Sequence, residues 1–320
     1  MSRRALPVPF LVLGMGILLC ALNGCGTVDK AIHRPNLVCL APDLSRIFIN
    51  DSQRGRVLIA DRRFRYLSEI AMPVGSSIWG IAVSPAGELA VTNGRQTSVA
   101  FSEAEQEEGN IAEICFYTLD GRETHRLAWR GEKRLLHTPG PIRFLSDGTF
   151  VVADYELNTI VRLDRSGKVL VKFGEFGHGE GQLYYPNDLA VASDGSLLVC
   201  ETYNFRLSRF TPDGTFLGHL GGKGREEGRF MFPQGLCFDA AGNLYVTELS
   251  TMRVSVFGPD GSFRQAIQPL QQGFKADCLQ MFGVAWASDT GDLLVADSIN
   301  ECLHVIASDG RWVRAVTALE

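Results

Sequence analysis

The chain has 320 residues, of which 45% are hydrophobic and 21% are charged, and its formal net charge is -5. This is an ordinary globular composition with ample apolar material for a large core. A mildly acidic chain lacks the basic surface that nucleic-acid binding needs, so we expect no nucleic-acid partner.

The first 24 residues have the pattern of a bacterial export signal. Arg3 and Arg4 give a positive start, and the apolar run 10–22 that follows is too short to span a membrane comfortably. The run ends in Leu-Asn-Gly-Cys at 22–25, which resembles the lipobox of bacterial lipoproteins. A plain secretory signal with a coincidental cysteine is the alternative.

The lipobox resemblance implies that lipid is attached to Cys25 and that the membrane is a partner through this lipid. We therefore predict a signal peptide at 1–24, a lipidated linker at 25–35 and a folded domain at 36–320. More than one acyl chain anchors a soluble domain stably. The domain is expected on the periplasmic or extracellular side, and Gly26 after the cysteine favours the outer membrane.

Six segments of the mature chain have the pattern of a short apolar strand that ends on a polar or acidic residue. The closing residues are Asp51, Asn93, Asp154, Glu201, Glu248 and Asp297. An apolar residue precedes each of them by about twelve positions, and a glycine-containing turn such as 194–195 lies between. Such turns join adjacent antiparallel strands. Two further strands follow in each unit, as at 206–210.

Four strands in a unit of about 47 residues, repeated six times, predict an all-β protein. We expect a six-bladed β-propeller of four-stranded antiparallel blades, because ring closure removes the strand edges that an open stack would expose. The second and third closing residues are further apart than the others. This predicts an insertion in the second blade, carrying Glu103, Glu105, Glu107, Glu108 and Glu113, as a solvated loop or an elongated hairpin.

Blades four and five carry the most regular repeat. They share a glycine-rich segment, a proline, an acid and an arginine, at 177–183, Pro186, Glu201 and Arg206 and again at 222–230, Pro233, Glu248 and Arg253. This pattern resembles the NHL repeat. The resemblance implies that the acid and the arginine tie neighbouring strands together and have an architectural role.

The residues that enter the innermost strands are candidates for a ligand site in the channel. One aligned column contains Val38, Gly80, Pro141, Asp188, Gly235 and Gly283, and the column two positions later contains Leu40, Ala82, Arg143, Ala190, Cys237 and Ala285. Asp188 and Arg143 are the charged exceptions, and their equal strand parity predicts that they meet across the blade boundary. They form either a self-satisfied ion pair or a polar site for a protein or small-molecule ligand, with Asn187, Gln234 and Trp79 at its rim.

An enzymatic function is the alternative. The step at 186–189 resembles that of calcium-dependent gluconolactonase-type propellers, but that resemblance would require further acidic or amide ligands where Val38, Gln234 and Phe282 stand. The sequence therefore favours a non-catalytic binding or scaffolding propeller without metal or cofactor. A calcium-dependent lactonase-type hydrolase or lyase with a degenerate metal site remains the second hypothesis.

Six cysteines follow Cys25, and an exported protein can form disulfides. Cys278 and Cys302 are expected on the same face of the sixth blade, and they would pair if their Cα atoms lie within about 7 Å. Cys39, Cys200 and Cys237 lie in apolar strand patterns and are expected to be free thiols that act as small hydrophobic side chains.

Overall fold

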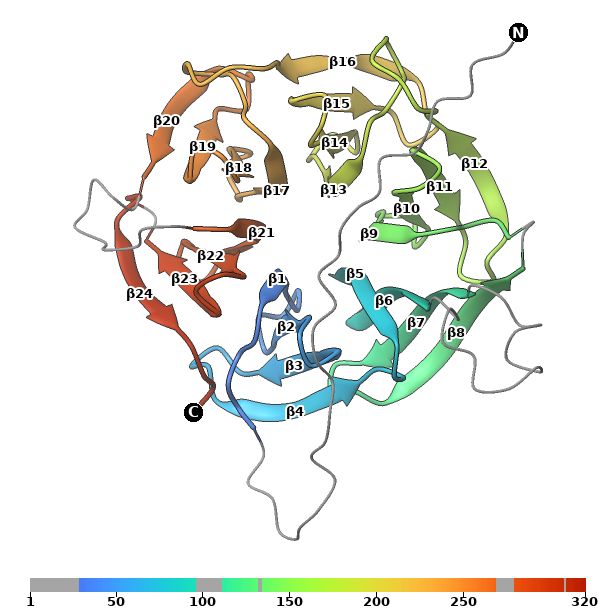
Figure 1. Ribbon diagram of the computed structural model, residues 1–320, viewed down its shortest axis with the longest axis vertical. Coiled ribbons are helices and arrows are strands. Elements are labelled where there is room, and N and C mark those ends of the chain that lie inside the picture. Colours follow the sequence, from blue (N-terminus) through green and yellow to red (C-terminus); the bar gives the residue numbers. More distant parts are fainter. Residues whose placement is uncertain (1–28, 96–110, 132–133, 269–278, 308) are drawn as a thin grey trace, which may run out of the picture.

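The computed structural model describes residues 29–95, 111–131, 134–268, 279–307 and 309–320. These residues form six four-stranded antiparallel sheets around a central axis (Figure 1), which confirms the predicted all-β six-bladed propeller. Each blade consists of four consecutive strands of the chain. Within the described part, no helix has the length and apolar character needed to cross a membrane.

In each blade the four strands follow one another outward from the axis, in chain order. The innermost strands are β1 (Pro35–Leu40), β5 (Ser76–Val83), β9 (Pro139–Phe144), β13 (Pro186–Val191), β17 (Pro233–Phe238) and β21 (Met281–Ala287). The second strands are β2 (Ile47–Asp51), β6 (Glu88–Arg95), β10 (Phe150–Asp154), β14 (Leu197–Glu201), β18 (Leu244–Glu248) and β22 (Asp292–Asp297). They end on the six closing residues of the repeat, except that β6 continues beyond Asn93.

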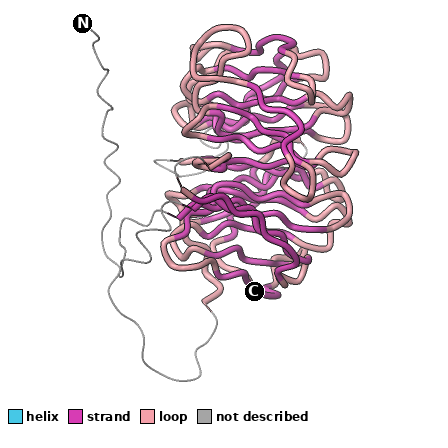
Figure 2. Tube along the Cα trace, turned by 90° about the vertical axis from the view of Figure 1, so that its right-hand side faces the viewer, coloured by secondary structure: helices cyan, strands magenta, loops and turns pink. Residues whose placement is uncertain are grey.

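The two outer positions complete each blade. The third strands are β3 (Arg56–Ala60), β7 (Ile111–Thr118), β11 (Thr159–Leu163), β15 (Arg206–Phe210), β19 (Arg253–Phe257) and β23 (Cys302–Ile306). The outermost strands are β4 (Tyr66–Ala71), β8 (Glu123–Arg130), β12 (Val169–Phe173), β16 (Phe216–Gly221), β20 (Phe263–Ile267) and β24 (Trp312–Val316). Figure 2 shows the blades from the side, with the connecting loops at both faces.

The hydrophobic core lies between neighbouring blades. The second strands are buried almost throughout, because both faces of each sheet are covered by adjacent sheets, whereas the outermost strands are partly exposed. Six clusters of buried apolar side chains each join two adjacent blades. The ring is therefore stabilised by six similar interfaces.

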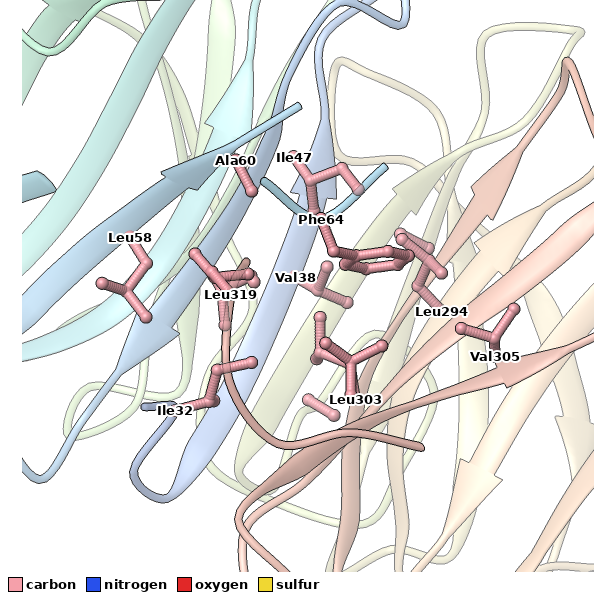
Figure 3. Packing of buried hydrophobic residues seen from close by; sticks show 14 residues of the cluster. Ile32, Val38, Ile47, Leu58, Ala60, Phe64, Leu294, Leu303, Val305 and Leu319 are labelled. Carbon is pink, nitrogen blue, oxygen red and sulfur yellow. The ribbon is translucent and has the colours of Figure 1, made fainter. Parts of the chain in front are cut away.

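The two ends of the described chain meet at the junction of blades one and six. Ala31 pairs with Ala318, and the backbone N–H of Leu319 donates to the carbonyl of Lys30 at 2.9 Å. Ile32 and Leu319 are buried in one cluster with Phe64 (Figure 3). Part of the predicted linker at 25–35 thus belongs to the propeller, which begins before residue 36. The sequence did not predict this, because the run of apolar residues in 25–35 is too short to indicate a strand.

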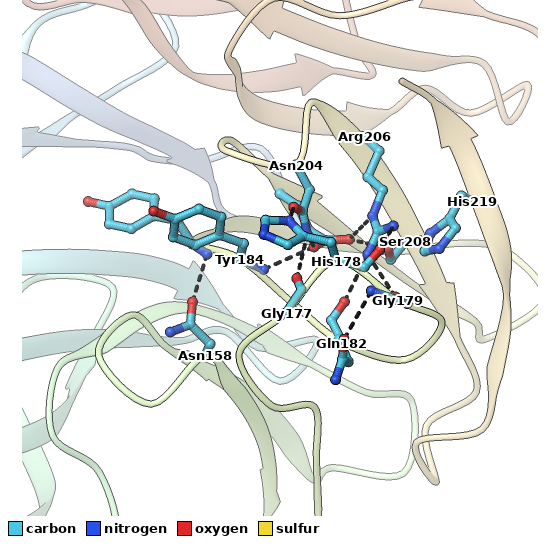
Figure 4. A network of polar contacts seen from close by, with 12 residues as sticks. Asn158, Gly177, His178, Gly179, Gln182, Tyr184, Asn204, Arg206, Ser208 and His219 are labelled. Carbon is cyan, nitrogen blue, oxygen red and sulfur yellow. Dashed lines mark hydrogen bonds and ion pairs between the residues drawn. The ribbon is translucent and has the colours of Figure 1, made fainter. Parts of the chain in front are cut away.

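The acid and the arginine of the repeat form buried ion pairs. Glu201 accepts from Arg206 Nε at 2.8 Å, and Glu248 accepts from Arg253 Nε at 2.7 Å. The remaining nitrogens of Arg206 donate to carbonyls of the preceding loop, including that of Gln182 (Figure 4). These contacts confirm the architectural role implied by the NHL resemblance.

The second blade places one acid of the predicted insertion in a strand. Glu113 lies in β7, is buried and accepts from Arg126 Nη1 at 3.1 Å. Of the two forms predicted for this insertion, the described part has that of an elongated hairpin, because β6 and β7 are eight residues long each, and Glu113 pairs there with Asn93. The other acids of the insertion, Glu103, Glu105, Glu107 and Glu108, lie outside the described residues.

Candidate functional site

Strand pairing decides which inner-strand residues face the axis, and the first blade departs from the predicted alignment by one position. Asp188 pairs with Cys200, the residue directly before the closing acid of its blade. In the first blade the residue directly before the closing acid is Asn50, and it pairs with Leu37 instead of Val38. The reason is a turn after β1 that is one residue longer than the turn after β13. The second column therefore contains Cys39 instead of Leu40.

Arg143 and Asp188 lie in contact across the boundary of blades three and four. Arg143 Nη2 donates to Asp188 Oδ1 at 2.7 Å. The carboxylate also accepts from the backbone N–H of Leu189 at 2.8 Å and from that of Leu236 at 2.9 Å. Burial raises the pKa of Asp188, and the nearby Arg143 and the two N–H groups oppose this shift. Asp188 thus connects three consecutive blades.

Arg143 also faces an open space at the end of the channel where the inner strands finish. Its side chain is 27% exposed, against 6% for Asp188. Its Nη1 donates to the carbonyl of Ile142 at 2.8 Å. A guanidinium has five N–H donors, of which these bonds use two.

This space, which we call the axial pocket, has a volume of about 460 Å³. All six blades contribute to its wall, which is largely apolar. The lining residues are Val38, Cys39, Leu40, Pro42, Ile81, Ala82, Val83, Pro85, Arg143, Phe144, Ala190, Val191, Leu236, Cys237, Phe238, Val284, Ala285 and Trp286. Among these described residues, Arg143 is the charged one.

Two of the predicted free thiols belong to the axial pocket. Cys39 and Cys237 are partly exposed to it, whereas Cys200 is fully buried. All three are free thiols, as predicted. Burial raises the pKa of Cys39 to about 12 and also raises that of Cys237. Both thiols are therefore neutral at physiological pH and act as apolar wall groups.

The other predicted rim residues lie at the opposite mouth, where the inner strands begin. Asn187 Nδ2 donates to Gln234 Oε1 at 3.1 Å. The hydroxyl of Tyr155 reaches the carbonyls of Asn187 at 3.3 Å and of Trp79 at 3.5 Å. The Tyr155 ring meets the edge of Trp79 and stacks on Tyr185. Trp79, Asn187 and Gln234 do not line the axial pocket, so the predicted site residues form two groups.

Tyr155 is the central residue of this mouth, and the sequence analysis missed it. A Cβ atom on Gly140 would lie 2.7 Å from its ring, so the neighbouring inner strand needs glycine at this point. A signal was present in the column that follows the closing residues. That column contains Ser52, Gly94, Tyr155, Thr202, Leu249 and Ser298, in which tyrosine is the aromatic exception.

The step at 186–189 does not gather oxygen ligands as a calcium site would. Both oxygens of Asp188 accept hydrogen bonds from the fold, and the amide of Asn187 faces Gln234 through its nitrogen. Calcium takes six to eight oxygen ligands. These described residues have the geometry of an internal hydrogen-bond network.

Two predictions concern residues outside the described part of the chain. Cys25 lies in 1–28, so lipid attachment stays a prediction. Cys278 lies in 269–278, so its pairing with Cys302 also stays a prediction. Cys302 itself is buried in β23, with its Sγ 3.6 Å from His304 Nε2.

Comparison with known proteins finds the repeat and the fold. The family described as NHL repeat matches residues 183–210 and 230–257, in blades four and five. A search of curated proteins gave no match.

Solved structures resemble the chain in fold alone. A catalytically inactive virginiamycin B lyase from Staphylococcus aureus, solved with quinupristin, is 15% identical, with a TM-score of 0.61 over 90% of this chain and 85% of that one. Kuenenia stuttgartiensis hydrazine synthase is 14% identical, with a TM-score of 0.58 over 90% and 99%. A functionally unknown protein from Desulfotomaculum acetoxidans is 13% identical, with a TM-score of 0.58 over 90% and 86%.

Proposed function

We propose that the protein is a non-catalytic binding propeller, displayed from a bacterial membrane by lipid on Cys25. Its axial pocket binds a small ligand that has an apolar body and a carboxylate or similar anionic head. The observation that carries this proposal is the apolar wall with the Arg143 guanidinium exposed in it. Small-molecule sites typically have volumes of about 300–1,000 Å³, and the volume of the axial pocket lies within this range.

The ion pair with Asp188 shapes the kind of ligand that fits. Because the carboxylate neutralises much of the charge of Arg143, long-range attraction of an anion is weak. Recognition then depends on the short-range N–H donors of the guanidinium, whose planar arrangement suits a carboxylate. The apolar wall contributes affinity in proportion to the ligand surface that it removes from water.

A catalytic function is the second candidate, because a protein of the same fold, virginiamycin B lyase, is named as an enzyme. General acid–base catalysis needs a carboxyl, imidazole or similar group poised near neutral pH. The described lining of the axial pocket offers a guanidinium and two thiols of raised pKa. This set supports binding better than it supports catalysis.

Octanoate is a suitable probe, and the pocket thiols report its position. Bound octanoate should slow alkylation of Cys39 and Cys237, measured by peptide mass spectrometry. Cys115 and Cys200, which are buried outside the axial pocket, are internal controls whose slow rates should not change. Equal rates with and without saturating octanoate would argue against this pocket as the ligand site.

A further inference from the structure

The buried acids of blades four and five each have the same two partners. Glu248 accepts from Arg253 and also from Ser255 Oγ at 2.6 Å. Glu201 has the same arrangement with Arg206 and Ser208, and Figure 4 shows this arginine and serine beside each other. A buried carboxylate thus receives a cation from the residue five positions later and a hydroxyl from the residue seven positions later.

In the sixth blade the same three places contain Asp297, Cys302 and His304. Asp297 pairs across the strands with Cys302, as Glu248 pairs with Arg253. Asp297 and His304 are 0% exposed, and Cys302 is 2% exposed. The repeat has therefore kept its buried acid here and replaced arginine and serine with two metal-ligating side chains.

The three ligand atoms lie at distances that suit a metal ion. His304 Nε2 is 3.0 Å from Asp297 Oδ2 and 3.6 Å from Cys302 Sγ, and all three atoms lie within 4.8 Å of one another. Zinc lies about 2.3 Å from a sulfur ligand and about 2.0–2.1 Å from a nitrogen or oxygen ligand. At tetrahedral angles these bonds place sulfur and nitrogen about 3.6 Å apart, and nitrogen and oxygen about 3.3 Å apart. The two distances measured from His304 Nε2 lie within about 0.3 Å of these values.

The surroundings hold the ligands in place. Asn300 Nδ2 donates to Asp297 at 2.7 Å, and the backbone N–H of Gln280 donates to its other oxygen at 3.2 Å. The Trp312 ring packs edge to face against His304, with centroids 4.4 Å apart. Such second contacts fix the orientation of metal ligands.

We propose that Asp297, Cys302 and His304 bind a transition-metal cation of the Zn²⁺ class. The metal supplies the positive charge that Arg206 and Arg253 supply in their blades. A carboxylate, a thiolate and a neutral imidazole balance a divalent cation, and binding releases the thiol proton to solvent. Thiolate and imidazole ligands favour zinc over calcium or magnesium. These three residues leave the fourth position of a tetrahedral ion to a water molecule or another donor, and their burial means that the metal would stabilise the sixth blade.

A matched control comes from the repeat itself. The double variant Cys302→Arg with His304→Ser restores the set of blades four and five, and Asp51 with Arg56 shows that an aspartate accepts this arginine at 2.9 Å. The protein expressed from its full-length sequence should contain about one zinc per chain by elemental analysis. Chelation should lower its Tm by several degrees. The double variant should contain no zinc, and its Tm should not respond to chelator.

Cobalt substitution provides a readout that does not depend on the double variant folding. Co²⁺ bound to the protein should show thiolate-to-cobalt charge-transfer absorption, which Cys302→Ser abolishes. Three results would overturn the proposal: a protein that neither contains zinc nor responds to it, unchanged cobalt absorption in Cys302→Ser, or a disulfide between Cys302 and Cys278 in non-reduced peptides.

Discussion

Asp188 shows how one side chain can organise several blades. Alignment of the six repeats predicted that it contacts Arg143. Both residues are charged in columns that are otherwise uncharged, and their side chains lie on the same face of their strands. The alignment could not predict the two backbone donors, because that of Leu189 depends on the side-chain rotamer of Asp188 and that of Leu236 on how closely the next inner strand approaches. Those donors make Asp188 a structural acceptor as well as a counterion.

Replacing Arg143 with methionine should lower the free energy of unfolding by about 1–3 kcal/mol. Stranding a buried charge costs about 3–5 kcal/mol, and the loss here is smaller because two backbone N–H groups still stabilise the carboxylate. Adding Asp188→Leu should not restore stability, because it leaves those N–H groups without an acceptor. Urea denaturation of both variants measures this. A double variant as stable as the wild type would contradict the account.

At the scale of elements, the turns between strands repeat one device. An aspartate accepts from the backbone N–H two residues later and from the hydroxyl of that residue, as Asp194 does with Ser196. Asp147, Asp164 and Asp260 do the same. These hydrogen bonds lower the pKa of each carboxyl below its usual value.

Lowered pKa values predict the direction of acid sensitivity. A carboxyl whose pKa is lower in the folded state stabilises the fold above its unfolded pKa of about 4, and this contribution is lost as pH falls through the folded value. The Tm should therefore decline below about pH 4. Asparagine at Asp147, Asp164, Asp194 and Asp260 retains an acceptor without titrating, so the quadruple variant should decline less. Thermal scans from pH 2.5 to 7 test this, and parallel declines would contradict it.

The same turns set the limits of sequence prediction. Glycine-containing turns and apolar strand patterns gave the number of blades and the ends of the second strands. They did not give the register of β1, because one additional turn residue moves every side chain to the opposite face. They also missed Tyr155, whose place at the mouth depends on the neighbouring strand at Gly140.

At the scale of the whole molecule, the propeller is a ring whose last junction joins distant parts of the chain. Segment 30–32 pairs with residues 317–319, and Tyr66 N–H donates to the carbonyl of Glu320. A repeat pattern predicts that a ring closes. It does not show which residues close it, because the closing contacts lie outside the repeat.

Leu319 tests the contribution of this closure. It is 4% exposed and packs against the first blade, so Leu319→Ala should lower the free energy of unfolding by about 2–5 kcal/mol through the cavity that it creates. Val313, on β24, is 52% exposed, and Val313→Ala should change stability by no more than about 0.5 kcal/mol. Equal small effects in urea denaturation would show that the chain end contributes little.

The proposed display from a membrane requires lipid on Cys25. If this residue carries lipid, Cys25→Ser should leave the signal peptide uncleaved or release the protein from the membrane fraction. Fractionation and intact mass measurement in the native bacterium separate these states. Unchanged processing together with unchanged membrane retention would contradict the proposed anchor.

Calorimetric titration of octanoate into the folded protein tests the central claim, that the axial pocket binds an amphipathic anion through Arg143. Arg143→Met should weaken binding at least about tenfold, or about 1.4 kcal/mol, because a charge-assisted hydrogen bond is lost. Arg209→Met, which alters an exposed ion pair with Asp194, should bind as the wild type does. Octanol, which lacks the anionic head, should bind more weakly than octanoate to the wild type. Equal octanoate affinity in the wild type and Arg143→Met would contradict the account.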